Sequence, residues 1–163
     1  MYAQSVPFLI QNLESTIKFL KKAEAAIEAR KLDKSVVLAL RIYPDMLPLL
    51  RQLTLLSDHA KGAGARLSGV ANPSFPDEEK TFEDLYARLA KTVDFLKSLD
   101  AKSFEGAETR NVTLKRRGQD MTMTGLNYFH GYALPNFYFH MTTTYNILRG
   151  IGIELGKSDF VSA

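Results

Sequence analysis

Apolar residues recur at three- and four-residue spacing along most of the chain, which predicts long amphipathic helices. The first helix covers about residues 5–30. A short apolar connection follows over 36–43, and is either one helical turn or an extended strap across the end of the helices. The second helix is expected to begin at Tyr43-Pro44-Asp45, with the proline in its first turn, and to end at Gly69, a residue type that stops helices.

The second half of the chain predicts two more helices with a hairpin between them. Thr81-Phe82-Glu83-Asp84 resembles a capping box and begins a third helix, which ends near Asp100. The stretches 111–115 and 120–124 alternate with period two on either side of Arg117-Gly118-Gln119, the pattern of a β-hairpin. Because two strands alone are marginally stable, we expect the hairpin to pack its apolar face on the helices.

The last predicted helix, Phe129–Gly152, places two polar side chains on its apolar face. Asn136 and His140 lie one turn apart, and burying an amide and an imidazole costs free energy unless each finds a partner. The pair therefore indicates either a core hydrogen-bond network or a ligand-binding pocket. Pro135 lies inside this helix and predicts a kink near Gly131. The apolar stripe comprises Phe129, Tyr132, Ala133, Asn136, His140, Thr143, Ile147 and Ile151.

Other polar and aromatic residues are weaker candidates for a site. His59 falls at the flank of the second helix's apolar face, and Asp58 projects nearly opposite that face if the helix is straight. For either residue alone, a solvated position is favoured. His130 lies off the core stripe and is expected to be exposed. The aromatic run over 128–139 is typical of a core or a dimer interface.

Composition narrows the class of protein. The 163 residues are 45% hydrophobic and 24% charged with a net charge of +3, which fits one soluble domain over 1–163. Basic residues are dispersed, and the densest run, Lys115-Arg116-Arg117, belongs to a turn, so we expect no nucleic-acid partner. With no cysteine, disulfides and thiolate metal sites are excluded, and a cytoplasmic location is expected. No stretch approaches the roughly 20 apolar residues of a membrane span, and neither a P-loop nor an H-E-x-x-H motif occurs.

Ordered sequence blocks along the chain resemble a known family. It is an uncharacterised family of bacterial proteins, named only as a domain of unknown function, within the DinB/YfiT-like superfamily. The blocks are Tyr43-Pro44-Asp45-Met46-Leu47-Pro48, Asp58 followed by Ala60-Lys61-Gly62-Ala63, Pro73-Ser74-Phe75, Phe104-Glu105-Gly106-Ala107, Ala133-Leu134-Pro135-Asn136-Phe137-Tyr138-Phe139-His140 and Gly156-Lys157-Ser158-Asp159-Phe160.

The resemblance implies an all-α, DinB/YfiT-like four-helix bundle with a small β-hairpin before the last helix, commonly a homodimer. In metal-binding members of the superfamily, three histidines hold a divalent ion, one from the second helix and an H-x-x-x-H pair from the fourth. Alignment on Leu148-Arg149 places that pair on Asn136 and His140, and the remaining ligand near Asp58 or His59. One expected histidine is therefore an asparagine, which weakens a transition-metal site.

Three functions remain open on the sequence. The favoured one is binding of a small molecule in a polar pocket formed by Asn136, His140, Tyr132 and Asp58. The second is a divalent-metal-dependent enzyme, hydrolase or thiol-transferase-like, with a weak metal site from His140, His59 and Asn136 or Asp58. The third is a structural or stress-related interaction module in which the polar pair is architectural.

Overall fold

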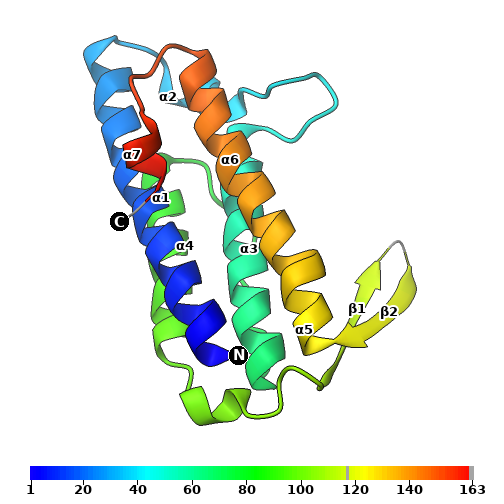
Figure 1. Cartoon of the computed structure of the whole chain (residues 1–163). Coiled ribbons are helices and arrows are strands. Elements are labelled where there is room, and N and C mark those ends of the chain that lie inside the picture. The colour runs from blue at the N-terminus through cyan, green and yellow to red at the C-terminus, as the bar shows by residue number, and fades with distance from the viewer. Residues whose placement is uncertain (117, 162–163) are drawn as a thin grey trace.

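Four long helices form the body of the protein, as the apolar spacing predicts. The computed structural model describes residues 1–116 and 118–161. The helices run along a common axis and enclose one apolar core. The first helix extends from one end of the bundle to the other (Figure 1). They are α1 (Tyr2–Ala29), α3 (Leu49–Ser68), α4 (Phe82–Lys97) and α6 (Leu134–Gly150).

Short helices connect these elements. Residues 34–39 form one of them, so the apolar connection after α1 is a helical turn rather than an extended strap. Its N-cap is Asp33, whose side chain accepts hydrogen bonds from the backbone N–H groups of Ser35 and Val36. The short helices are α2 (Lys34–Ala39), η1 (Ala101–Phe104), α5 (Gly125–Tyr128), the π-helical turn η2 (Phe129–Ala133) and α7 (Lys157–Phe160).

The predicted hairpin is present between η1 and α5. Strands β1 (Asn111–Arg116) and β2 (Gln119–Thr124) pair antiparallel, and the hairpin extends from the side of the bundle (Figure 1). On β1, Val112 and Leu114 are buried, which confirms the expected apolar contact with the helices. Lys115 is exposed. Arg117, which the sequence places in the turn, lies outside the described residues.

Helix boundaries follow the capping residues in two places and depart from the prediction in a third. Thr81 and Asp84 form the expected capping box, and Gly69 ends α3 with φ of 79°. The predicted start of that helix at residues 43–45 is wrong, because α3 begins only after Pro48. A proline disfavours helical geometry in the residue before it, so Pro48 delays the helix start.

Pro135 has the expected effect on the last helix. The backbone N–H of Leu134 bonds the carbonyl of Phe129, five residues back, so the turn before the proline is π-helical. The extra residue rotates the apolar face of α6 by about one position relative to a straight helix. Phe137 and Met141 are consequently buried, while Asn136 is only half-buried. The expectation of a fully buried Asn136 is therefore wrong.

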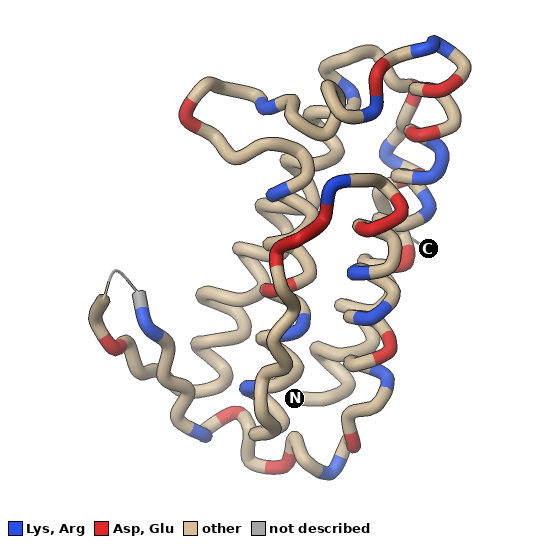
Figure 2. The backbone as a smooth tube through the Cα atoms, turned by 180° about the vertical axis from the view of Figure 1, so that it is seen from behind, with Lys and Arg blue, Asp and Glu red and all other residues tan. Residues whose placement is uncertain are grey.

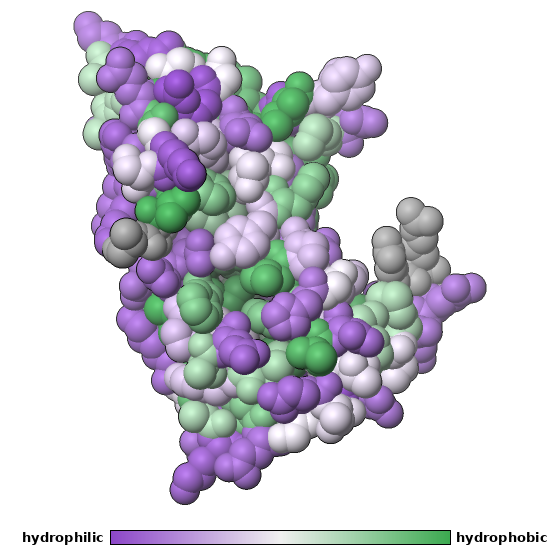
Figure 3. Space-filling model, in the orientation of Figure 1, coloured by the Kyte–Doolittle hydropathy of each residue, from purple (hydrophilic) through white to green (hydrophobic). Residues whose placement is uncertain are grey.

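Helices α3 and α4 pack closely against each other at Gly64. A Cβ atom added to Gly64 would lie 2.6 Å from a methyl carbon of Leu96, so the glycine allows this close approach. On the face viewed in Figure 3, hydrophilic and hydrophobic residues are interspersed, and the surface is indented between the upper bundle and the hairpin. Among the described residues, no helix is both long and apolar enough to cross a membrane.

Candidate functional site

His140 is a buried histidine with a fixed protonation pattern. It is 7% exposed, and its Nδ1 lies 2.7 Å from Oε1 of Gln52 on α3. The Nε2 amide of Gln52 donates to the carbonyl of Leu47 at 2.9 Å, so its Oε1 must face the imidazole and accept. Nδ1 of His140 therefore carries the proton, and Nε2 keeps a free lone pair.

A second imidazole lies beside His140. The rings of His59 and His140 are 5.3 Å apart between centroids and inclined by only 17°, and the ring of Tyr132 lies 6.0 Å from that of His59. His59 is half-buried, as its flank position predicted. Helices α3 and α6 pack against each other, so two histidines separated by 81 positions (140 − 59) become neighbours.

Both imidazoles are neutral at physiological pH. Burial, with a smaller contribution from the adjacent His59, lowers the pKa of His140 to about 4. Burial also lowers the pKa of His59; the carboxylate of Asp58 opposes that shift, and the nearby charge of Arg66 adds to it. Two neutral rings with unprotonated nitrogens can accept hydrogen bonds or act as bases.

The remaining predicted site residues have partners of their own, although Asp58 also lines the cavity beside His59, which Asn136 does not. The Nδ2 group of Asn136 donates to the backbone carbonyl of Tyr132 at 2.7 Å, one turn back on its own helix. The carboxylate of Asp58 lies 2.9 Å from Arg88 and 3.2 Å from Lys61. The structure therefore brings together His140, His59 and Tyr132, whereas Asn136 and Asp58 have their own partners. His130 is exposed, as expected.

The donor set does not match the three-histidine centre that the resemblance implies. The described part of the chain holds no group of three or more His, Cys, Asp or Glu side chains that could bind a metal ion. His59 and His140 supply two imidazoles, and the third position is the amide of Asn136. Zinc and nickel sites of this kind take three strong nitrogen or sulfur ligands. These residues therefore do not fit a tightly bound transition metal.

A cavity of about 700 Å³ opens beside the imidazoles. His59 and Tyr132 line one side, Phe75 in the loop between α3 and α4 lines another, and Lys115 of the hairpin reaches it from β1. The volume is in the range of pockets that hold small molecules. Polar and apolar side chains both contribute to its walls, as such pockets require.

Arg66 also lines this cavity, and sequence reasoning missed it. Its Nη1 donates to the hydroxyl of Tyr128 at 3.2 Å, and its guanidinium lies 5.7 Å from that ring's centroid. A Cβ atom at Gly62 would lie only 2.3 Å from Nη1, so the guanidinium folds back into the space that this glycine leaves. The signal was available, since Arg66 follows His59 by seven residues and shares its helix face.

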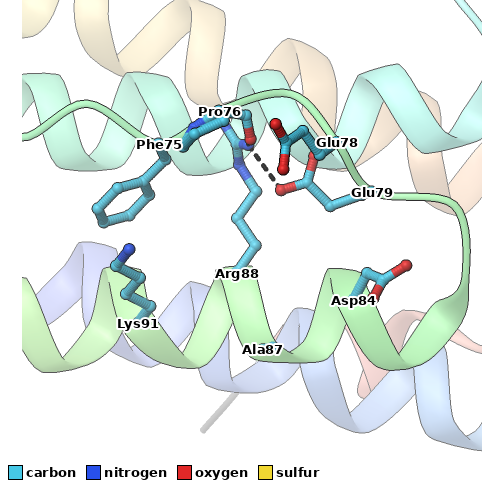
Figure 4. A pocket seen from close by; sticks show the side chains of 8 residues that line it. All are labelled: Phe75, Pro76, Glu78, Glu79, Asp84, Ala87, Arg88 and Lys91. Atoms are coloured by element: carbon cyan, nitrogen blue, oxygen red, sulfur yellow. Dashed lines mark hydrogen bonds and ion pairs between the residues drawn. The ribbon is translucent and has the colours of Figure 1, made fainter.

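A second arginine, Arg88 on α4, contacts the loop between α3 and α4. Arg88 is 4% exposed and contacts the carboxylates of Asp58 at 2.9 Å, Glu79 at 2.8 Å and Asp77 at 3.2 Å. Burial opposes its charge, but the carboxylates of Glu79 and Asp58 outweigh that effect and raise the pKa of Arg88. Figure 4 shows the side chain rising from α4 between Phe75 and Glu79.

Arg88 with Asp58, Asp77 and Glu79, here called the Arg88 cluster, holds this loop against the bundle. Arg88 also donates to the carbonyl of Pro76 at 3.0 Å, and Lys61 donates to that of Pro73 at 2.7 Å. The ammonium groups of Lys61 and Lys91 lie 4.5 and 4.3 Å from the centroid of the Phe75 ring. Seen from behind in Figure 2, the acidic part of the loop crosses this face of the bundle.

Comparisons with known proteins agree with this architecture. The crystal structure of a DinB family member protein from Shewanella denitrificans is 35% identical in sequence and superposes with a TM-score of 0.93, over 99% of this chain and 92% of that one. No curated protein gives a significant match. The model of the family described as domain of unknown function DUF1993 matches residues 1–161. The chain belongs to this family of DinB-like helical bundles.

Proposed function

We propose that the protein binds a small molecule in the cavity beside His59 and Tyr132. The observation that carries this proposal is the neutral imidazole of His59 at the wall of a cavity of about 700 Å³, with the ring of His140 stacked against it. Gln52 holds the ring of His140, which stacks on His59, so the imidazole at the cavity wall is held in place before any ligand arrives. Such preorganisation lowers the entropy cost of binding.

The roles of the site residues follow from their places. His59 and Tyr132 line the cavity and contact the ligand. His140 lies behind His59 and holds the ring stack in place, with Gln52 as its anchor. Asn136 stiffens the turn that carries Tyr132, through its hydrogen bond to the Tyr132 carbonyl.

A thermal-shift screen of metabolites tests the proposal. Compounds that raise the unfolding temperature of the wild type should lose most of that effect in His59→Gln and in Tyr132→Phe. His130→Gln is the matched control, because His130 is exposed on the same helical stretch as Tyr132. If no compound stabilises the wild type, or if the stabilisation survives in His59→Gln, the proposal fails.

Metal analysis separates this function from the metal-dependent enzyme. Protein purified without an affinity tag should contain no stoichiometric zinc, nickel or iron, since the donor set offers two imidazoles and one amide. Stoichiometric metal that disappears in His140→Ala would favour the enzyme instead.

The proposal includes a cytoplasmic homodimer, as the sequence predicts. Tyr138 and Phe139 on α6 are exposed, which supports a role for the aromatic run in an interface. Light scattering of the wild type and of Phe139→Ser tests the dimer. A monomeric wild type would contradict it.

A further inference from the structure

Arg66 has far fewer partners than its chemistry allows. A guanidinium offers five N–H donors, and among the described residues Arg66 has one hydrogen-bond acceptor, the hydroxyl of Tyr128. No carboxylate among residues 1–116 and 118–161 forms an ion pair with it. The phenol of Tyr128 stays protonated, because burial raises its pKa. A half-buried cation therefore faces the cavity without a counter-charge.

The acidic residues of the cavity cannot supply that counter-charge. Asp58 pairs with Arg88 and Lys61. Asp77 pairs with Arg51 at 2.7 Å and with Arg88 at 3.2 Å. Both carboxylates are therefore already paired with other cations of the protein, of which Lys61 also lines the cavity.

Other positive charge adds to that of Arg66. Lys115 of the hairpin lines the cavity and forms no ion pair with a described carboxylate. Arg66 already acts on its surroundings, since its charge contributes to lowering the pKa of His59, after burial as the main cause. The cavity lining therefore includes two cations without a described carboxylate partner, Arg66 and Lys115, and a neutral acceptor, His59.

We propose that this cavity binds an anionic small molecule and that Arg66 holds its carboxylate or phosphate oxygens. A planar guanidinium matches either group with two parallel hydrogen bonds. Gly62 takes part by leaving the space in which the guanidinium lies against the helix. This inference rests on the proposed function and names its ligand class.

A titration with inorganic phosphate, followed by NMR, tests the inference directly. Phosphate is added against chloride at equal ionic strength, and the Nε–Hε signal of Arg66 and the amide signal of His59 are recorded. Both signals should shift saturably in the wild type. A parallel titration with acetate shows whether a carboxylate gives the larger response, and thus which oxyanion the site prefers.

Three variants make the titration decisive. Arg66→Gln should raise the half-saturating phosphate concentration roughly 10- to 100-fold, the range for hydrogen bonds to charged groups. Gly62→Ala keeps the charge but displaces the guanidinium, and should weaken binding in the same direction. Arg41→Gln is the matched control, because Arg41 is exposed and has no described ion pair. Circular dichroism checks that each variant is folded.

The outcomes distinguish the inference from the proposed function. Equal phosphate and acetate responses in the wild type and Arg66→Gln, or no saturable response to either ion, would overturn the inference. In that case, neutral compounds that stabilise the protein through His59 would leave the proposed function standing. If compounds of no charge class stabilise it, both fail together.

Discussion

Arg88 and Arg66 carry the same charge on neighbouring helices, but their surroundings differ completely. Arg88 is almost fully buried and contacts the carboxylates of Asp58, Asp77 and Glu79. Arg66 is half-buried and donates to a single phenol hydroxyl. The first arginine is satisfied by the protein itself, whereas the second has donors left over.

The difference separates a structural cluster from a binding site. The cavity beside Arg88 is about 360 Å³, and its arginine has its acceptors in place. The cavity beside Arg66 and His59 is about 700 Å³, and its lining includes two cations without a described ion pair, Arg66 and Lys115, and the neutral imidazole of His59. An incoming ligand gains more where the protein's own hydrogen-bonding groups are unused.

The largest expected loss of stability is that of Arg88→Met, and Arg66→Met is the comparison. Arg88→Met leaves three carboxylates without their shared cation, and we expect a loss of about 3–4 kcal/mol in the free energy of unfolding. Arg66→Met should cost only about 1 kcal/mol, because it loses one hydrogen bond and one ring contact. Urea unfolding measures both. Similar losses of stability in the two variants would contradict the distinction between the paired Arg88 and the unpaired Arg66.

Acid should lower the free energy of unfolding through His140, which belongs to the imidazole pair on the side of Arg66. Folded His140 stays neutral down to its pKa of about 4, while in the unfolded chain it takes up a proton near its ordinary value of 6.5. Stability therefore falls as pH decreases from about 6.5 to 4, by on the order of 3 kcal/mol. His140→Gln should flatten this part of a pH series of urea unfolding curves. An unchanged slope in the variant would contradict the lowered pKa.

Two glycines on α3 provide a matched pair of substitutions. Gly64→Ala forces a methyl group against Leu96 and Leu99 in the core, and should cost about 2 kcal/mol. Gly62→Ala meets only the mobile end of Arg66, and alanine favours helix by roughly 1 kcal/mol, so stability should be equal or higher.

Thermal unfolding of the two alanine variants distinguishes the roles of these glycines. If Gly62→Ala destabilises the protein as much as Gly64→Ala, Gly62 is a packing residue, and its role is not to leave space for the guanidinium of Arg66.

The smallest effect concerns the ring that covers the Arg88 cluster. Phe75→Leu removes the contacts of the ring with Lys61 and Lys91, and should cost about 1 kcal/mol. Phe8→Leu is the control, because Phe8 is an exposed ring on α1 with no described cation near it. Equal losses in chemical unfolding would show that the cations add nothing.

Local patterns predicted most of the fold. The apolar spacing, the capping box at Thr81 and the stop at Gly69 each depend on residues close in sequence, and each is confirmed. The start of α3 was placed too early, because Pro44 and Pro48 both suit a first helical turn. The π-helical turn before Pro135 also changed which side of α6 is buried, and with it the place of Asn136.

The site was only partly accessible to sequence reasoning. His140 and Tyr132 were found because polar and aromatic groups on a predicted apolar face stand out. The contact of His140 with Gln52 and His59 depends on how α3 and α6 pack, which a helical period does not specify. The helical period places Arg66 on the same face as His59, but its lack of a described carboxylate partner depends on how the helices pack and is visible only in three dimensions.

A crystal structure of the protein grown with a phosphate-bearing ligand from the screen tests the central claim most directly. The account predicts electron density for the phosphate against the guanidinium of Arg66, with the rest of the ligand extending toward His59 and Tyr132. Density at another place, or an Arg66 side chain paired with one of the protein's own carboxylates, would contradict it.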